Sequence, residues 1–134
     1  MSKTFQIDII TPASLHTYEQ VSYVRAPSID GLVGIQARHA HAIIALDIGE
    51  IKIIDQNGKT KYFATSGGFV DVKPEGVQLL LETFEQANEI DKKRVQASLD
   101  RAQKRLNDKN IDLERSQKAL KRAQNRLHVM SRLS

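Results

Sequence analysis

The chain has 134 residues, enough for one medium-sized domain or for a small domain with an appendage. Hydrophobic residues make up 40% of the chain and charged residues 27%, a balance typical of folded globular proteins rather than disordered ones. Because the chain has no cysteine, disulfides, thiolate catalysis and sulfur-ligated zinc sites are all excluded.

Charge is distributed unevenly along the chain. Residues 1–86 carry 7 Lys/Arg against 10 Asp/Glu, a balance of −3, whereas residues 87–134 carry 13 against 6, a balance of +7. All 3 prolines and all 7 glycines also lie in the first part. These asymmetries predict two units with different roles, one over residues 1–86 and one over residues 87–134.

No segment of the chain has the pattern of a membrane span. The longest apolar runs, such as HAIIALDIG and VQLLL, are far shorter than the roughly 20 residues needed to cross a bilayer. The opening residues, MSKTFQIDII, also lack the pattern of a signal peptide. We therefore expect the chain to lie on the cytoplasmic side of a membrane, without a span of its own.

The first predicted elements are strands. In TFQIDII, Phe5, Ile7 and Ile9 share one face, as expected of a half-buried strand. VSYVRA follows the connecting segment 11–20 as a second strand, and GLVGIQ is a short third one.

Two turns join the later strands. In EIKIIDQNGKTKYFAT, the pair Asn57-Gly58 predicts a tight hairpin turn between two β-rich runs. In GGFVDVKPEGVQLLLETF, the Pro-Glu-Gly sequence ending at Gly76 predicts another. Several short strands joined in this way predict an N-terminal antiparallel β-sandwich or barrel.

From about Asn88 the pattern becomes helical, without any Gly or Pro. One apolar stripe has helical spacing: Val95, Leu99, Ala102 and Leu106. A second stripe follows the polar turn 107–110: Leu113, Ser116, Leu120, Ala123, Leu127 and Met130. Two such helices predict a C-terminal antiparallel two-helix hairpin. Its small stripe residues bury little area, so we expect a hairpin that needs a neighbouring surface for stability.

The residues offer no catalytic site. His39 and His41 would share one face of a strand, but no third ligand lies nearby and the spacing is not that of a zinc motif. No paired carboxylates or Ser-His-Asp arrangement can be argued from the spacing. TSGGF is not a phosphate loop, so its glycines predict a bulge or a close backbone approach.

The basic hairpin admits three interpretations. It can be a solvated face with intrahelical ion pairs such as Asp91 with Arg94. It can be a phosphate footprint for nucleic acid, although it has no aromatic residue and contains interspersed acids. It can also bind an anionic ligand or acidic partner, because Arg94 with Arg101, and Arg122 with Arg126, share helix faces whose guanidinium forks suit phosphate oxygens.

Motifs along almost the whole chain resemble one known family. The N-terminal motifs are IITPASLHTYEQVSYVRAPSIDGLVGI, ALDIGEIKI and the specific SGGFVDVKP. The helical part adds EID with the arginine three residues on, and ALKRAQNRL. The sequence thus resembles the epsilon subunit of bacterial F-type rotary ATP synthases.

The resemblance implies a non-catalytic rotor subunit of the central stalk, bound to the membrane only through the complex. Its sandwich would contact the gamma subunit and the c-ring. Its hairpin would move between a folded position and an extended one that reaches the alpha/beta catalytic hexamer and inhibits ATP hydrolysis. The competing hypothesis from the residues alone is a free-standing basic helical module that binds nucleic acid or another anionic partner; under the resemblance, no nucleic-acid partner is expected.

The resemblance also implies a regulatory ATP site on the folded hairpin, with no resident cofactor and no metal. The positions that match are Glu85, Ile90, Asp91, Arg94, Arg101, Arg122 and Arg126. The arginines would contact phosphates, and Glu85 and Asp91 would position the nucleotide. Two positions depart from the family pattern: Val95 stands where it has Ala, and the segment IQARHAHA differs from its Pro-Gly-His-x-Pro.

Overall fold

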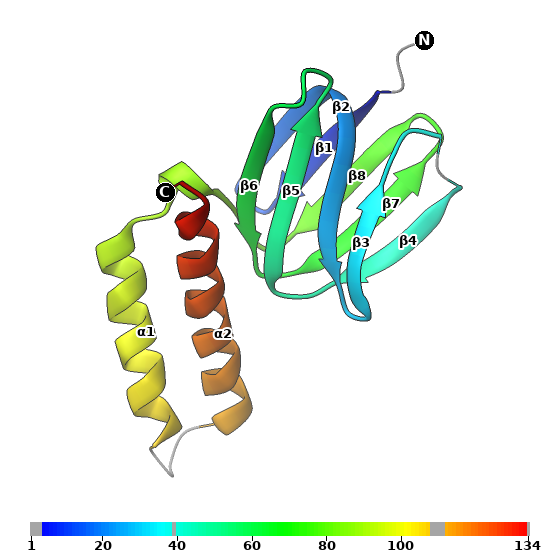
Figure 1. The fold of residues 1–134 in the computed structure, drawn as a ribbon. Helices are drawn as coiled ribbons and strands as arrows, with labels where there is room; N and C mark the ends of the chain where they lie inside the picture. The colour runs from blue at the N-terminus through cyan, green and yellow to red at the C-terminus, as the bar shows by residue number, and fades with distance from the viewer. Residues whose placement is uncertain (1–3, 39, 108–111, 134) are drawn as a thin grey trace.

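The computed structural model describes residues 4–38, 40–107 and 112–133. Nine strands are followed by two helices that stand beside one end of the sheet structure (Figure 1). The strands are β1 (Phe5–Thr11), β2 (Ser14–Ser28), β3 (Gly31–Ile35), β4 (Ala42–Leu46), β5 (Gly49–Asp55), β6 (Thr60–Thr65), β7 (Gly68–Lys73), β8 (Gly76–Leu81) and β9 (Phe84–Gln86). The helices are α1 (Lys92–Leu106) and α2 (Leu113–Met130), with short 3₁₀ turns η1 (Ala87–Glu89) and η2 (Ser131–Leu133).

The strands form two layers packed face to face (Figure 1). One layer contains β1, β8, β7 and β4, and the other contains β3, β2, β5, β6 and β9. The long strand β2 belongs to both, because its first half pairs with β1 and its second half pairs with β3 and β5. The predicted β-sandwich followed by a helical hairpin is therefore confirmed.

The core lies between the two layers and is built from alternating strand residues. Ile7 and Ile9 of β1 are fully buried, and Phe5 packs at the edge of the same cluster, as their spacing predicts. Phe63 of β6 is fully buried and stacks on Phe84 of β9 with ring centroids 4.3 Å apart. This apolar core gives the sandwich a source of stability that does not involve the helices.

Two features of the sheet differ from the sequence prediction. The segment 11–20 is not only a connection, because β2 begins at Ser14 and its polar first half pairs with β1 as exposed strand. Gln20 has a positive φ of 56° where the strand passes from one layer to the other. In addition, β1 pairs with β8 in parallel, so the sandwich is not purely antiparallel.

The glycine turns fall where they are predicted. Gly58 closes the β5–β6 hairpin with a φ of 81°, and Gly76 is the first residue of β8, directly after the turn that follows β7. Gly68 of the TSGGF segment has a φ of 149°, and a Cβ there would lie 2.0 Å from the carbonyl oxygen of Leu80. The predicted close backbone approach is therefore confirmed at Gly68.

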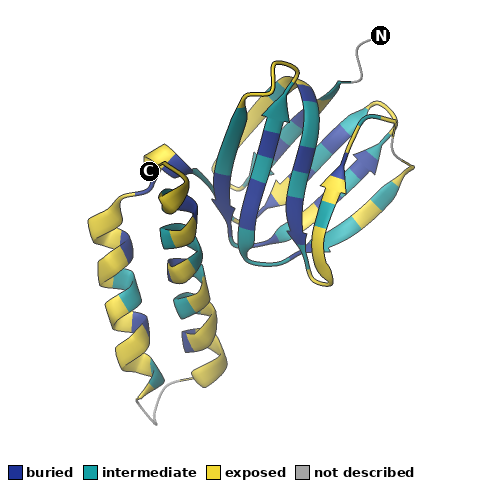
Figure 2. Ribbon diagram, viewed as in Figure 1, coloured by how far each residue is buried: buried dark blue, intermediate teal, exposed yellow. Residues whose placement is uncertain are grey.

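The two helices run side by side as a folded hairpin (Figure 1). Most of the hairpin's outer surface is exposed (Figure 2), and the buried Val129 of α2 packs in a cluster with Ala64 and Ala87. The inner residues include Ala102 and Ala123, which are small, as the stripes predict. The C-terminal half of α2 packs against β5 and β6, so the sandwich supplies the neighbouring surface expected for the hairpin. Among the described residues, neither helix combines the length and apolar character that crossing a membrane requires.

Candidate functional site

Asp91 begins the first helix and helps to shape the site. It is the N-cap of α1, where its carboxylate accepts hydrogen bonds from the backbone N–H groups of Lys93 and Arg94 at 3.0 and 3.2 Å. An aspartate at this position satisfies free N–H groups and complements the positive end of the helix dipole. The predicted side-chain ion pair between Asp91 and Arg94 is not formed; the carboxylate binds backbone instead, which leaves the Arg94 guanidinium available.

Glu85 and Arg126 join the sandwich to the second helix. Arg126 of α2 donates from Nε to Glu85 Oε1 of β9 at 2.7 Å, and both side chains are about one-third exposed. A short charge-assisted bond of this kind fixes the direction of both groups. It also means that an incoming anion must compete with Glu85 for Arg126.

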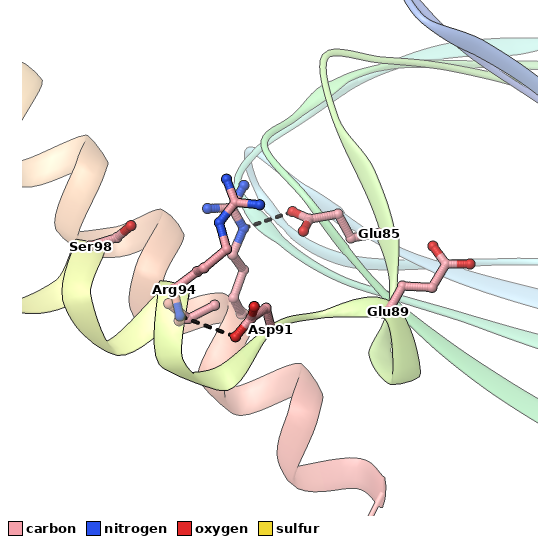
Figure 3. Close-up of a pocket in the computed structure, with 7 residues that line it drawn as sticks. Glu85, Glu89, Asp91, Arg94 and Ser98 are labelled. Atoms are coloured by element: carbon pink, nitrogen blue, oxygen red, sulfur yellow. Dashed lines mark hydrogen bonds and ion pairs between the residues drawn. The ribbon is translucent and has the colours of Figure 1, made fainter.

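A cavity of about 190 Å³ lies where β9, η1 and the two helices meet. Its lining residues are Glu85, Glu89, Asp91, Arg94, Val95, Ser98 and Arg126. In Figure 3, Glu85 and Arg94 point into the same space from the sandwich and from α1, and Asp91 lies at the start of the helix. The cavity is thus polar and open, with both acidic and basic groups on its walls.

A second cavity of about 190 Å³ continues along the groove between the helices. Its lining residues are Ser98, Arg101, Ala102, Arg105, Ala119, Arg122, Ala123 and Arg126. The two cavities share Ser98 and Arg126, so they form one groove that runs along the hairpin between its helices. The small side chains of Ala102, Ala119 and Ala123 form its floor and allow the arginines to lie on either side.

The groove brings together most of the residues singled out from the sequence. Six of the seven predicted ligand-binding residues line it; Ile90 does not. Ile90 is 8% exposed and packs in a small apolar cluster that also contains Val95 and Val129. Val95 lines the first cavity but is only 4% exposed, so its extra bulk is directed mainly into that cluster.

The charges in the groove are only partly compensated. Among the described residues, Arg94, Arg101 and Arg122 form no ion pair, and Arg101 donates a hydrogen bond from Nη2 to the hydroxyl of Ser98 at 3.1 Å. Guanidinium groups gathered without carboxylate partners repel one another, and an anion between them relieves that repulsion. The groove therefore presents guanidinium groups without carboxylate partners beside the acidic groups of the first cavity.

Sequence reasoning missed Glu89, Ser98 and Arg105 as groove residues. Arg105 is four residues from Arg101, so its position on the same helix face could have been read from the spacing. The same spacing argument applies to Ser98, which lies four residues after Arg94 and three before Arg101 on α1. Glu89 gives no such signal, because it lies in the 3₁₀ turn η1 before the helix. Glu89 also acts on a residue that does not line the groove. Burial, and secondarily the charge of Glu89, raise the pKa of Tyr18 above its usual value.

Of the pair His39 and His41, the structure describes only His41. His39 lies outside the described residues, as does most of the polar turn predicted at 107–110. His41 forms an ion pair with Asp71 across β4 and β7, with Nε2 and Oδ1 3.2 Å apart. Within the ranges that the structure describes, no group of three or more metal-binding side chains comes together.

The fold and the groove define a class of protein: a β-sandwich followed by a folded basic hairpin that carries an arginine-lined groove. Comparisons with known proteins identify the family. Residues 4–87 match the family described as "ATP synthase, Delta/Epsilon chain, beta-sandwich domain". Residues 88–131 match "ATP synthase, Delta/Epsilon chain, long alpha-helix domain". The chain belongs to the delta/epsilon chain family of ATP synthase, and the resemblance seen in the sequence is confirmed.

Bacterial relatives are similar over most of the chain. An ATP synthase epsilon chain of Desulforamulus reducens is 40% identical over 109 residues, which cover 81% of this chain and 82% of the relative. One from Carboxydothermus hydrogenoformans is 39% identical over 106 residues, or 79% of this chain and 78% of the relative. Family membership also makes this a non-catalytic chain of the complex, as predicted.

Solved structures share the fold. A chain in the cryo-EM structure of the Euglena gracilis mitochondrial ATP synthase has a TM-score of 0.82 and 18% identity, and the match covers 100% of this chain and 83% of that one. A chain of the Tetrahymena thermophila mitochondrial ATP synthase central stalk and c-ring has a TM-score of 0.59 and 17% identity, with 98% and 97% covered.

Proposed function

We propose that the chain is a rotor subunit of the central stalk of ATP synthase. The match of both parts of the chain to one family carries this proposal. Residues 1–86 provide the rigid part, which contacts the gamma subunit and the c-ring and couples rotation driven by the ion gradient to ATP synthesis. The subunit is peripheral, on the cytoplasmic side of the membrane, and associates with the membrane through the complex.

Residues 87–134 restrain ATP hydrolysis by moving from the folded position to an extended one. The balance of +7 in this segment suits an acidic surface of the alpha/beta hexamer. In support of such a movement, the hairpin has few large buried side chains and contacts the sandwich mainly through the C-terminal half of α2 and the η2 turn.

Removal of the hairpin tests the inhibitory role. In the assembled complex, deletion of residues 88–134 is expected to leave ATP synthesis largely intact and to raise the rate of ATP hydrolysis. An unchanged hydrolysis rate in complexes that contain the truncated chain contradicts an inhibitory hairpin. Loss of synthesis in the same complexes would instead show that the hairpin is needed for coupling rotation to synthesis.

The arginine groove is the regulatory nucleotide site in this proposal. Its arginines contact the phosphates of ATP, and Glu85 and Asp91 position the nucleotide. ATP would link α1 to α2 because it contacts Arg94 and Arg101 on one helix and Arg122 and Arg126 on the other. The ligand thus favours the folded hairpin by binding one conformation better than the other.

Calorimetry on the isolated chain tests the nucleotide site. ATP is expected to release heat on binding, and the double variant Arg122→Ala, Arg126→Ala is expected to lose it. Lys104→Ala is a suitable control, because it also removes an exposed cation from the hairpin but does not line the groove. If the native chain gives no heat above background at millimolar ATP, the groove is an interaction surface and not a nucleotide site.

A further inference from the structure

The contact between α2 and the sandwich contains a polar stripe that the proposed function does not use. On the hairpin, the stripe has the spacing of one helix face and continues into η2: Lys121, Asn125 and His128 of α2, and Arg132 of η2. On the sandwich, its partners lie before and at the start of β5: Asp47, Gly49 and Glu50. Each helix residue has one partner in this short segment, so the stripe forms a continuous connection.

Glu50 is the centre of this connection. It is only 8% exposed, although it is a carboxylate at the start of a surface strand. Arg132 donates to both of its oxygens, from Nε at 2.9 Å and from Nη2 at 3.0 Å. Arg25 of β2 donates to Oε1 at 3.1 Å, and His128 Nε2 lies 3.6 Å from Oε2. One buried carboxylate thus binds cations from the sandwich and from the end of the hairpin.

Arg132 is held on more than one side. Its guanidinium lies over the ring of Tyr62 in β6, 4.9 Å from the centroid, which adds a cation–π contact to the two hydrogen bonds. The hydrogen bond to Glu50, and the charge of that carboxylate, raise the pKa of Arg132 above its usual value. A two-bond arginine–carboxylate pair with a buried acceptor is the strong form of this interaction.

The remaining contacts of the stripe are weaker but point in the same direction. Lys121 Nζ lies 3.0 Å from Asp47 Oδ2 with both side chains about half exposed, so solvent screens this pair. Asn125 donates to the carbonyl oxygen of Gly49 at 2.7 Å. The apolar part of the contact is small: among the residues that the structure describes, Val129 is its only fully buried α2 member.

The stripe and the arginine groove occupy different faces of α2. Each residue turns the helix by about 100°, so Arg126 lies roughly a quarter turn from Asn125. ATP in the groove would join α2 to α1 beside the Glu85–Arg126 pair, whereas the stripe joins α2 to a different part of the sandwich, the segment from Asp47 to Glu50. Holding the hairpin in its folded, docked position therefore involves two separate connections, and only one of them contains the nucleotide.

We propose that Glu50 is a catch that holds α2 on the sandwich by binding Arg132, and that it thereby sets the fraction of chains with a docked hairpin. Docking by this catch does not depend on the proposed function. Only its consequence for ATP binding rests on the proposed function, in which the docked hairpin is the state that binds ATP. An affinity measured for ATP is weakened by the fraction of molecules that are not competent to bind. Weakening the catch therefore lowers apparent ATP affinity without changing any groove residue.

Spin labels report docking directly, because the chain has no cysteine of its own. One label is attached at Asn57→Cys in the β5–β6 turn and the other at Gln117→Cys on the exposed face of α2. The distance between these two labels changes when the hairpin leaves the sandwich. Pulsed electron spin resonance on the full chain without ATP is expected to give one distance population for the native sequence. Arg132→Gln is expected to add a second, longer one.

Two further variants make the result specific. Glu50→Gln should also release the hairpin, but it leaves Arg25 without its carboxylate, and the Arg25 Nε is already buried without a hydrogen-bond partner. Arg132→Gln keeps the Glu50–Arg25 pair, so it is the decisive variant if Glu50→Gln disturbs the sandwich. Lys104→Gln removes one positive charge from an exposed position of α1 and should keep the single distance.

The distances and the ATP affinity decide separate questions. The proposal requires the docked fraction to fall at least fivefold in Arg132→Gln and the apparent dissociation constant for ATP to rise by the same factor. A single docked distance in Arg132→Gln overturns the catch, even if ATP binds. If the hairpin is released but ATP binds to no variant, nor to the native chain, the catch stands and the nucleotide proposal falls.

Discussion

Asp91 illustrates how one side chain can serve structure and ligand at once. Its carboxylate caps α1 through the N–H groups of Lys93 and Arg94, while its outer surface lines the first cavity. The sequence alone assigns Asp91 either to an ion pair or to the nucleotide. The cap is a third role. It requires an acceptor oxygen but not a negative charge, so substitutions that remove the charge alone or the acceptor as well can separate the two properties.

The cap can be tested with two substitutions at Asp91. Asp91→Ala is expected to destabilise α1 by about 1 kcal/mol, because two N–H groups lose their acceptor. Asp91→Asn keeps an acceptor oxygen and should retain most of that stability. Amide hydrogen exchange at Lys93 and Arg94 is the measurement: fast in the alanine variant and close to native in the asparagine variant. Equal exchange in both variants would show that the cap contributes little.

Asp47 provides a pH-dependent part of the hairpin contact. The hydrogen bond from Lys121 is the largest of the effects that lower the pKa of this carboxyl below its ordinary value. A carboxyl with a lowered pKa in the folded state stabilises that state above its unfolded pKa of about 4, and the contribution is lost as pH falls through the folded pKa. The Lys121–Asp47 contact should therefore weaken in acid below about pH 4.

NMR titration of the Asp47 carboxyl measures this effect. Lys121→Gln is expected to raise the pKa of Asp47 toward its ordinary value and to remove its share of the acid dependence. Lys104→Gln, on the other helix, is expected to leave the titration unchanged. If the pKa of Asp47 is the same with and without Lys121, the contact between their side chains does not persist in solution.

At the scale of elements, the sandwich is more predictable than its connections. Alternation identifies β1, and the Asn-Gly and Pro-Glu-Gly sequences identify two hairpins, because these signals are local. The first half of β2 has no such signal, since its polar residues are exposed and are ordered by pairing with β1. The parallel pairing of β1 with β8 joins strands far apart in the sequence, which no local pattern reveals.

The helices show the same limit in a different form. The predicted stripes identify the α1–α2 contact correctly at Ala102, Ser116 and Ala123, which are buried. Leu113 belongs to the stripe by spacing yet is 54% exposed, and Val129 lies outside the stripe yet is fully buried. The reason is that α2 has two partners. One face of α2 packs against α1, and a second face meets the sandwich. Which residues lie on the second face depends on how the hairpin docks, and the spacing of apolar residues along the helix does not reveal it.

Val129 tests the importance of that second face. Val129→Ala is expected to lower the free energy of unfolding of α2 by about 2 kcal/mol, because it removes buried methyl groups beside Ala64 and Ala87. Leu113→Ala removes a larger side chain from an exposed position and should change stability by less than about 0.5 kcal/mol. Urea unfolding followed by helical circular dichroism gives both values. A reversed order would mean that the docked face is not formed.

The whole molecule contains two apolar clusters of unequal size. The large cluster lies within the sandwich, and the small one joins Ala64 and Ala87 to Ile90, Val95 and Val129 of the hairpin. The large cluster includes no helix residue, so the sandwich does not depend on the hairpin for its core. The hairpin, in contrast, shares its largest buried side chains with the sandwich.

This inequality predicts different behaviour for the two parts when they are separated. A peptide of residues 88–134 keeps the α1–α2 contact but loses the small cluster and the Glu50–Arg132 connection. Without them its inner face offers mainly alanine and serine, and short helices in water are marginal unless they bury an apolar face. Circular dichroism is therefore expected to show the peptide less than half as helical as the same segment in the full chain.

A polypeptide of residues 1–90 is the matched counterpart. It should unfold cooperatively, with a melting temperature within a few degrees of the melting temperature of the sandwich in the full chain. Hairpin peptides that melt cooperatively at the same temperature as the full chain would contradict the expectation. They would show that the contact between the helices is sufficient for stability. The requirement for the sandwich is what makes docking adjustable: an element that is stable only when docked responds to any ligand or side chain that changes its docking.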